Sequence, residues 1–279
     1  MGRLALRLFL GLALCSCLQA CAVLDLRPPA LREEGFTAER ELRGRAILER
    51  AVQASGGREA WERYDSAEMH FADEWRGLLG CLFRPWPGNP TQLHMRFDLG
   101  MDRARGRFLS GAQRGDVWGQ AGDRTWSQEP GQARVDSNRE SVRFLFAAYH
   151  YFFELPLRMA EAPIVLHAGS RERAGRRYDL VFVTWGKLEP HVEHDQYVLW
   201  IPEDSGRIEI AEYTIRDKFR FVSGVNFFSD FRTVDGIVLP HAYWIALALD
   251  DEDFVHRVQL EDVRFHSPGP IPVDPATMR

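Results

Sequence analysis

The chain has 279 residues, 45% of them hydrophobic, which is enough for a substantial core in one large domain or two small ones. Its formal net charge is -5, and this acidic balance argues against nucleic acid as a partner, because phosphate binding needs a basic face. The basic segment 171–177 is short, and we interpret it as a solvated turn.

The first 20 residues have the layout of a signal peptide. Arg3 and Arg7 give a positive start, an apolar run follows over residues 8–18, and small or polar residues come after it. The apolar run is about half as long as a permanent membrane-spanning helix needs to be. We therefore expect residues 1–20 to be a cleaved leader.

The end of this leader resembles a bacterial lipobox. In "LQAC", Leu18 lies three residues before Cys21, and Ala20 lies directly before it. The resemblance implies that Cys21 carries palmitate or similar acyl chains and anchors the mature chain in a membrane. Ala22, in place of Asp, implies by the same resemblance the outer membrane, with the domain facing the periplasm. The inner membrane and the cell surface are the alternative locations. The alternative is an ordinary cleaved signal with an incidental cysteine.

The remaining cysteines then carry little chemistry. Cys15 and Cys17 leave with the leader, and Cys81 is the only free thiol. An intrachain disulfide and a cysteine metal cluster are thereby excluded. Cys81 lies among apolar residues, so we expect it to be a small buried hydrophobic side chain.

The N-terminal part of the mature chain divides into a tether and a helix. Residues 21–36 contain two adjacent prolines and no clear hydrophobic period, which predicts a tether. The folded domain is predicted over residues 37–279. It begins with a helix that Thr37 caps and that Gly56 and Gly57 end.

Beyond this helix the hydrophobic period changes to two. Short strands are predicted from residue 67 to residue 128, with Met69, Phe71 and Asp73 on one face of the first. A second helix is predicted over residues 138–153, and it is apolar over so much of its circumference that it must be mostly buried. Six further strands follow, as far as residue 266.

This order of elements favours an α+β fold. We expect one large, strongly curved antiparallel sheet, an incomplete barrel, with the two main helices packed on its concave face. Two separate domains, divided near residues 156–163, are the alternative. A single domain is preferred because the central helix is too apolar to lie at an edge.

The layout resembles the bacterial lipoprotein-carrier (LolA/LolB-like) fold over residues 40–266, and also bacterial lipoproteins of unassigned function. The stretches that carry the resemblance are "AVQASGG", "AAYHYFFELP" and "DQYVLWIPEDSGRIEIAEYT". It implies a half-barrel that helices close around an apolar cavity. It also implies binding of lipid or acyl chains without catalysis or a cofactor.

Several of the later strands are apolar on both faces, so they need cover on both sides, from helices, a partner or a ligand. A well-packed core without a cavity is the alternative. If a cavity exists, its candidate lining residues are Phe146, Tyr149, Phe153, Phe182, Trp185, Trp200, Phe228 and Trp244.

The stretch "EPHVEHDQ" is the best candidate for a metal site. His191, Glu193, His194 and Asp195 could bind zinc, with His241 or His256 as a further ligand. The neighbouring Pro190 favours a solvated loop instead. No GxSxG elbow, Walker loop or dinucleotide fingerprint occurs in the sequence.

The leading hypothesis is a non-enzymatic outer-membrane lipoprotein whose periplasmic domain binds an apolar ligand. One alternative is a structural or assembly protein of the envelope without a cavity. The other is a metal-dependent envelope enzyme. The sequence indicates no protein partner.

Overall fold

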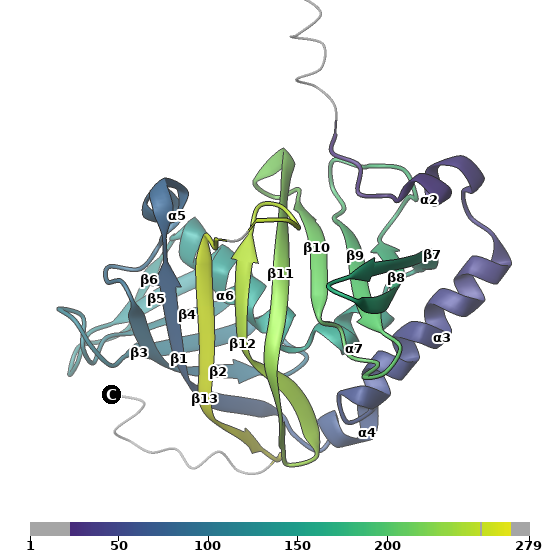
Figure 1. Cartoon of the computed structure of the whole chain (residues 1–279). Helices are drawn as coiled ribbons and strands as arrows, with labels where there is room; N and C mark the ends of the chain where they lie inside the picture. The colour runs from purple at the N-terminus through teal and green to yellow at the C-terminus, as the bar shows by residue number, and fades with distance from the viewer. Residues whose placement is uncertain (1–22, 252, 269–279) are drawn as a thin grey trace, which may run out of the picture.

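The computed structural model describes residues 23–251 and 253–268 and is drawn in Figure 1. The helices are α2 (Pro29–Glu34), α3 (Ala38–Ala54), α4 (Arg58–Trp61), α5 (Gly77–Phe83), α6 (Glu140–Phe153) and α7 (Leu155–Ala160). The strands are β1 (Ser66–Trp75), β2 (Thr91–Asp98), β3 (Arg103–Phe108), β4 (Val117–Ala121), β5 (Arg124–Gln128), β6 (Val135–Ser137), β7 (Ile164–Arg173), β8 (Arg176–Thr184), β9 (Gln196–Pro202), β10 (Ile210–Ile215), β11 (Phe219–Val234), β12 (Ile237–Ala246) and β13 (His256–His266).

All these strands form one antiparallel sheet in the order β6-β5-β4-β3-β2-β1-β13-β12-β11-β10-β9-β8-β7. The first and last strands of the chain meet at its centre, where Trp75 pairs with His256 and Ser66 with His266. The sheet curves but does not close, so β6 and β7 are its edges (Figure 1). The predicted α+β fold with one large, incomplete antiparallel barrel is confirmed.

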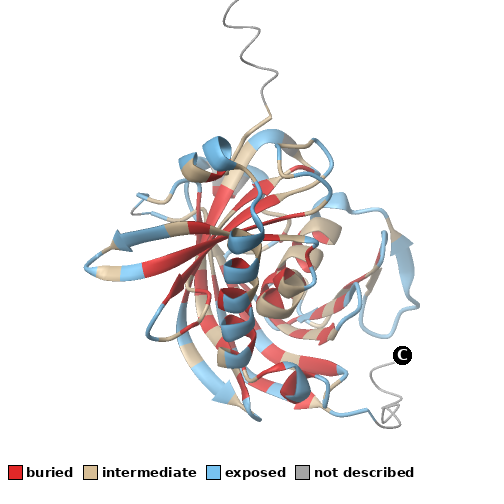
Figure 2. Ribbon diagram, turned by 90° about the vertical axis from the view of Figure 1, so that its right-hand side faces the viewer, coloured by how far each residue is buried: buried red, intermediate tan, exposed pale blue. Residues whose placement is uncertain are grey.

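Helix α3 forms where the sequence predicted a helix. The Thr37 hydroxyl accepts a hydrogen bond from the Arg40 amide (3.2 Å), and Gly56 and Gly57 follow the helix with positive φ. Gly44 lets the helix approach β7 closely, because a Cβ at this position would lie only 2.6 Å from a backbone atom of that strand. Figure 2 shows α3 with its outer face exposed and the buried sheet behind it.

Helix α6 lies inside the curved sheet, against the concave face. Half of its side chains are buried, among them Phe146, Tyr149 and Phe153. Pro156 occupies the second position of α7, where its missing N–H is not needed for the helix. Among the described residues, no helix is long and apolar enough to cross a membrane.

The sheet carries a separate apolar cluster on each face. The larger lies on the concave side and joins α3, α6 and α7 to the strands. The smaller lies on the convex side of the strands from β7 to β11 and includes Leu31 of α2. Strands β8 and β9 are buried on both faces for this reason, as their sequences predicted.

The predicted tether requires correction over its described part. Residues 23–36 pack against the sheet: α2 forms within them, and Leu31 is fully buried. The Leu26 amide donates to the buried Gln196 side chain (2.8 Å), which fixes the extended part of the segment. The leader and Cys21 lie outside the described residues, as does the side chain of Cys81.

Candidate functional site

The concave face is lined with large apolar side chains from alternate positions of its central strands. Phe71 of β1, Phe97 of β2, Tyr243 of β12 and Leu260 of β13 all face this space. The period-two patterns of these strands place such residues on one side, because successive side chains point to opposite faces. The result is a continuous aromatic and aliphatic wall.

Helix α6 fills the space enclosed by this wall. The Tyr149 ring lies 4.7 Å from the Phe71 ring, and the Phe153 ring lies 5.4 Å from the Phe97 ring, measured between centroids. Phe146 packs edge-on against Trp86, with the centroids 5.7 Å apart. Aromatic side chains of the helix therefore occupy the position that an apolar ligand would take.

A buried carboxylate on β1 is the polar centre of this face. Asp73 is fully buried, and its Oδ2 accepts hydrogen bonds from Trp75 Nε1 (2.6 Å), Trp86 Nε1 (2.8 Å) and the Tyr149 hydroxyl (2.5 Å). Its Oδ1 lies 3.1 Å from His256 Nδ1. Burial and the adjacent Asp73 carboxylate raise the pKa of Tyr149 well above its usual value, so the hydroxyl remains a donor.

Asp73 thus links α6, the segment after α5, and β13 to the central strand. Sequence reasoning placed it on the same face as Met69 and Phe71 but assigned it no role. The only sequence signal for this role was an acidic residue at an inward position of an alternating strand. The hydrogen-bond partners of Asp73 could not be predicted, because most of them come from distant parts of the chain.

A second polar contact holds the C-terminal end of α6. Glu154 is buried and accepts hydrogen bonds from the Gly100 amide (2.7 Å) and Arg158 Nε (2.8 Å). His150 Nε2 lies 3.5 Å from Glu154 Oε1. Burial raises the pKa of Glu154, but His150, Arg158 and the Gly100 amide together outweigh it and leave the pKa below its usual 4.5.

Two small cavities lie beside the C-terminal half of α6. Their volumes are about 30 and about 10 Å³, and Phe152, Phe153 and Pro240 line both. Ligand sites in proteins typically enclose roughly 300–1,000 Å³. Neither cavity is large enough to hold a lipid or acyl chain.

This architecture has solved counterparts, although no protein-family model and no curated protein sequence matches the chain. A LolA superfamily protein from Nitrosomonas europaea aligns with a TM-score of 0.50 and 12% identity, over 81% of this chain and 94% of that chain. A DUF1329 family protein from Desulfovibrio piger aligns with a TM-score of 0.52 and 13% identity, over 86% and 97%. This chain has the LolA-like fold. At these identities the likeness shows the fold alone, and it confirms the resemblance read from the sequence at that level.

Within the LolA-like fold, five of the eight predicted cavity residues face the concave side. Phe146, Tyr149 and Phe153 belong to α6, while Phe228 lines the larger cavity. Trp185 packs at the edge of the same core, 5.9 Å from the Tyr197 ring. These side chains share one continuous apolar region with α6.

The other three predicted residues lie on the convex side, so the eight do not line one space. Phe182 and Trp200 belong to the convex cluster, and Trp244 stacks on Phe227 with the ring centroids 4.1 Å apart. Trp200 is fixed by a hydrogen bond from its Nε1 to Glu212 (2.7 Å). A strand that is apolar on both faces gives no sequence signal for which face turns inward, and this explains the error.

The histidine-containing loop before β9 brings together three of the four groups predicted as metal ligands. Donor atoms of His191, Glu193 and His194 all lie within 4.8 Å of one another. Asp195 does not join them, because its Oδ1 accepts from the Thr214 hydroxyl (2.9 Å) and the Arg216 amide (2.8 Å). Burial raises the pKa of Asp195.

Neither proposed additional ligand comes near this loop. His256 bonds Asp73 in the concave core, and His241 lies beside the Leu239 carbonyl. Zinc–nitrogen bonds of 2.0–2.1 Å in a tetrahedral site require donors about 3.4 Å apart. The three loop donors fit zinc in their chemistry but would have to close together to bind it.

Proposed function

We propose that this chain is a membrane-anchored envelope lipoprotein that binds an apolar ligand, such as a lipid or acyl chain, without catalysis. In this proposal Cys21 carries the acyl anchor, and the domain faces the periplasm from the outer membrane. The ligand occupies the concave side of the half-barrel, in the space that α6 fills in the described structure.

One observation carries this proposal: a continuous apolar wall on the concave face is covered by helices of the same chain, and α6 packs on its central strands. An acyl chain that replaced α6 would bury the same wall, and each Å² of apolar surface removed from water contributes about 25 cal/mol. The displaced α6 would expose its own apolar face, so the buried surface of the ligand has to offset that loss.

The way in which α6 is held is compatible with such exchange. The N-cap residue Arg139 makes no side-chain capping hydrogen bond, and Glu140 in the first turn forms an exposed ion pair with Lys218. Exposed ion pairs contribute little stability. The strong polar contacts are those of Tyr149 and of Glu154 at the C-terminal end, and apolar packing holds the rest of the helix.

The titratable groups of the concave core also support binding rather than catalysis. Both oxygens of Asp73 contact side chains that stabilise the fold, and the Tyr149 hydroxyl donates a hydrogen bond to Oδ2. A catalytic acid or base needs contact with its substrate, whereas these groups contact each other.

Photo-crosslinking tests the proposal. Purified full-length processed protein is incubated with a diazirine-bearing fatty acid, irradiated and digested, and the labelled peptides are identified by mass spectrometry. We expect saturable labelling of concave-side residues such as Phe71, Phe97 and Tyr243. Labelling confined to the convex-side Phe182 and Trp200, or no saturable labelling, would contradict the proposal.

A pair of variants links uptake to α6. Tyr149→Phe removes the hydroxyl that bonds Asp73, so α6 leaves the wall more readily and a fluorescent fatty acid should bind several-fold faster. Tyr178→Phe makes the same chemical change on the convex side and serves as the control. Equal uptake rates for the two variants would show that movement of α6 does not limit binding.

A further inference from the structure

Large apolar side chains are exposed at one end of the molecule. Leu78 and Leu82 of α5 are 76% and 67% exposed, Phe221 at the start of β11 is 68% exposed, and Leu247 after β12 is 46% exposed. We name these four residues the apolar rim. Exposed leucine and phenylalanine side chains gathered on one surface mark sites of contact with a partner or a membrane.

The three segments that carry the apolar rim are neighbours. The Arg76 amide, just before α5, donates to the Val255 carbonyl in the β12–β13 connection (2.9 Å). Val225 of β11 pairs with Ala246 at the end of β12, so the β10–β11 hairpin lies beside that connection. Figure 1 shows α5, the β10–β11 hairpin and the β12–β13 connection at the same end of the sheet.

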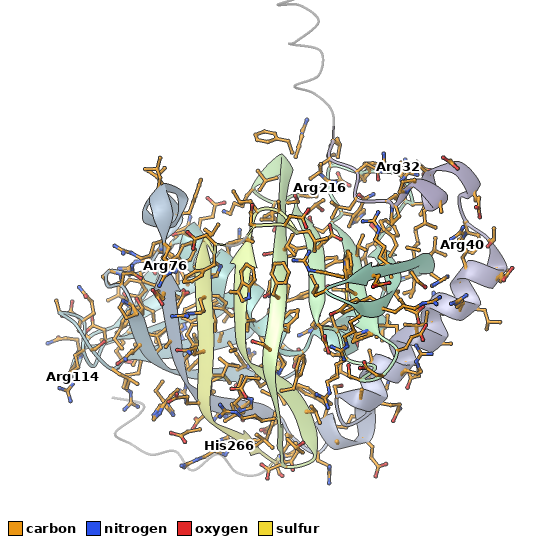
Figure 3. The ribbon with its side chains drawn as sticks, viewed as in Figure 1. Arg32, Arg40, Arg76, Arg114, Arg216 and His266 are labelled. Carbon is orange, nitrogen blue, oxygen red and sulfur yellow. The ribbon has the colours of Figure 1, made fainter. Side chains whose placement is uncertain are left out.

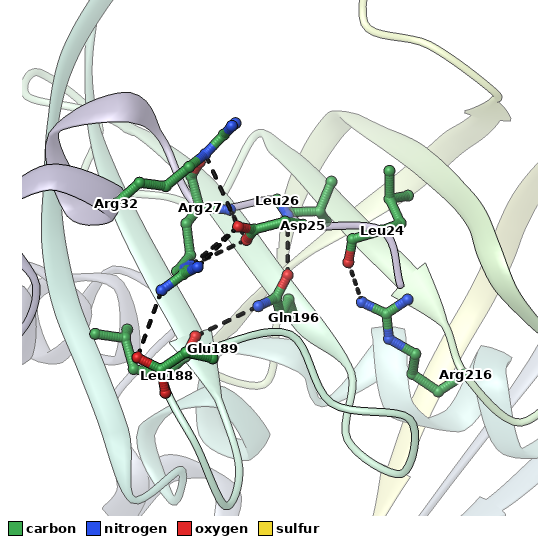
Figure 4. Close-up of polar contacts among 9 residues, drawn as sticks. All are labelled: Leu24, Asp25, Leu26, Arg27, Arg32, Leu188, Glu189, Gln196 and Arg216. Carbon is green, nitrogen blue, oxygen red and sulfur yellow. Dashed lines mark hydrogen bonds and ion pairs between the residues drawn. The ribbon is translucent and has the colours of Figure 1, made fainter. Parts of the chain in front are cut away.

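The described chain begins at this same end. The Leu24 amide donates to the Arg220 carbonyl (3.1 Å), next to Phe221, and the Arg216 guanidinium donates to the Leu24 carbonyl. Figure 4 shows Leu24 and Leu26 held by Arg216 and Gln196. Figure 3 places Arg216 and Arg76 toward this end and His266 at the opposite one.

The position of Leu24 limits how far a lipid anchor can lie from the apolar rim. Cys21 is three residues before Leu24, and three residues span at most about 11 Å when fully extended. A bilayer that holds acyl chains on Cys21 is therefore brought next to the hairpin that carries Phe221.

We propose that the apolar rim is a membrane-contact face, which inserts its side chains into the bilayer surface that anchors the chain. This inference rests on the anchor of the proposed function and adds the orientation of the domain. Because Lys218 in the same hairpin pairs with Glu140, it also places the start of α6 beside the bilayer. Lipid could then reach the concave face without crossing water.

Charges around the apolar rim indicate insertion rather than attraction to anionic lipid. Lys218 and Arg220 flank Phe221, but Asp250, Asp251 and Asp253 follow Leu247. Of these acids, Asp251 accepts hydrogen bonds from the Leu247 and Ala248 amides and so stabilises its own turn. The mixed charge gives no net attraction to a negative surface, so contact depends on the apolar side chains.

Depth-dependent quenching tests this face on the full, natively processed and acylated protein in phosphatidylcholine vesicles. A fluorophore is attached at Leu247→Cys or, as a control, at Met101→Cys, with Cys81→Ser in every sample so that only the new cysteine reacts. Met101 is 47% exposed, almost the same as Leu247. It lies in the β2–β3 turn, at the end of β2 that is farther from the apolar rim. Brominated phosphatidylcholine quenches only fluorophores that reach the bilayer.

We expect several-fold stronger quenching at Leu247 than at Met101, unchanged by high salt or by adding anionic lipid. Leu82→Asp should lower quenching at Leu247 roughly tenfold, because it removes an apolar side chain that the bilayer would bury and puts a charge in its place. Equal quenching at the two positions in vesicle-bound protein, or quenching that requires anionic lipid, would overturn the inference and leave the anchor intact. Protein that does not float with the vesicles would instead refute the anchor, and this inference would fall with it.

Discussion

The carboxylate of Asp73 gives the sharpest test of how the concave core is held together. Asp73→Asn keeps the size of the side chain but removes the negative charge that Trp75, Trp86 and Tyr149 share on one oxygen. Hydrogen bonds to a charged group contribute about 1.5–3 kcal/mol each, and neutral ones about 0.5–1.5 kcal/mol. Losing about 1 kcal/mol at each of three bonds lowers the free energy of unfolding by about 3 kcal/mol.

Urea denaturation followed by circular dichroism measures this loss. The midpoint should fall while the slope of free energy against urea stays constant, because the surface exposed on unfolding does not change. Asp136→Asn is the control: the Asp136 side chain is 71% exposed on β6, and the change should stay within about 0.5 kcal/mol. A loss below about 1 kcal/mol for Asp73→Asn would refute the view that the shared charge braces α6, β1 and β13.

Three further predictions concern other parts of the molecule. The pKa of Glu154 is lowered from 4.5 in the folded chain, so the stability it contributes is present above pH 4.5 and is lost as the pH falls through the folded value. The urea midpoint of Glu154→Gln should therefore fall less between pH 7 and pH 4 than that of the wild type. Equal falls would contradict this. Leu31→Ala should cost about 2–3 kcal/mol in urea denaturation because Leu31 is fully buried, whereas the exposed Leu42→Ala should change stability by no more than about 0.5 kcal/mol. Elemental analysis should find the same substoichiometric zinc in the wild type and in His194→Ala, since the loop donors are spread over as much as 4.8 Å. One full equivalent of zinc in the wild type that is absent from the variant would refute this.

Much of the architecture follows from periodicity alone. The second helix was predicted over residues 138–153 and spans Glu140–Phe153, because an apolar pattern around most of a helix can be satisfied only in a core. The alternating strands gave the single large antiparallel sheet. Helix α5 was not predicted, since its seven residues are too few to establish a period.

The candidate site was predicted only in part. The three α6 residues Phe146, Tyr149 and Phe153 do lie against the concave wall, as a helix that plugs the half-barrel requires. Trp200 lies on the other side of the sheet, and Asp73 received no role from its sequence context. Both depend on which segments become neighbours, and local patterns do not contain that information.

The sequence by itself determined the class of fold and the buried central helix, because both depend on short-range patterns of apolar and polar residues. The leader with its lipobox-like end stays a prediction. Only the tertiary structure decided which face of the doubly apolar strands turns inward, that residues 23–36 pack on the sheet, and that Leu78 and Phe221 share one end with the start of the described chain. The physical reason is that these contacts join distant parts of the chain, as in the antiparallel pairing of β1 with β13, whose partners lie nearly two hundred positions apart.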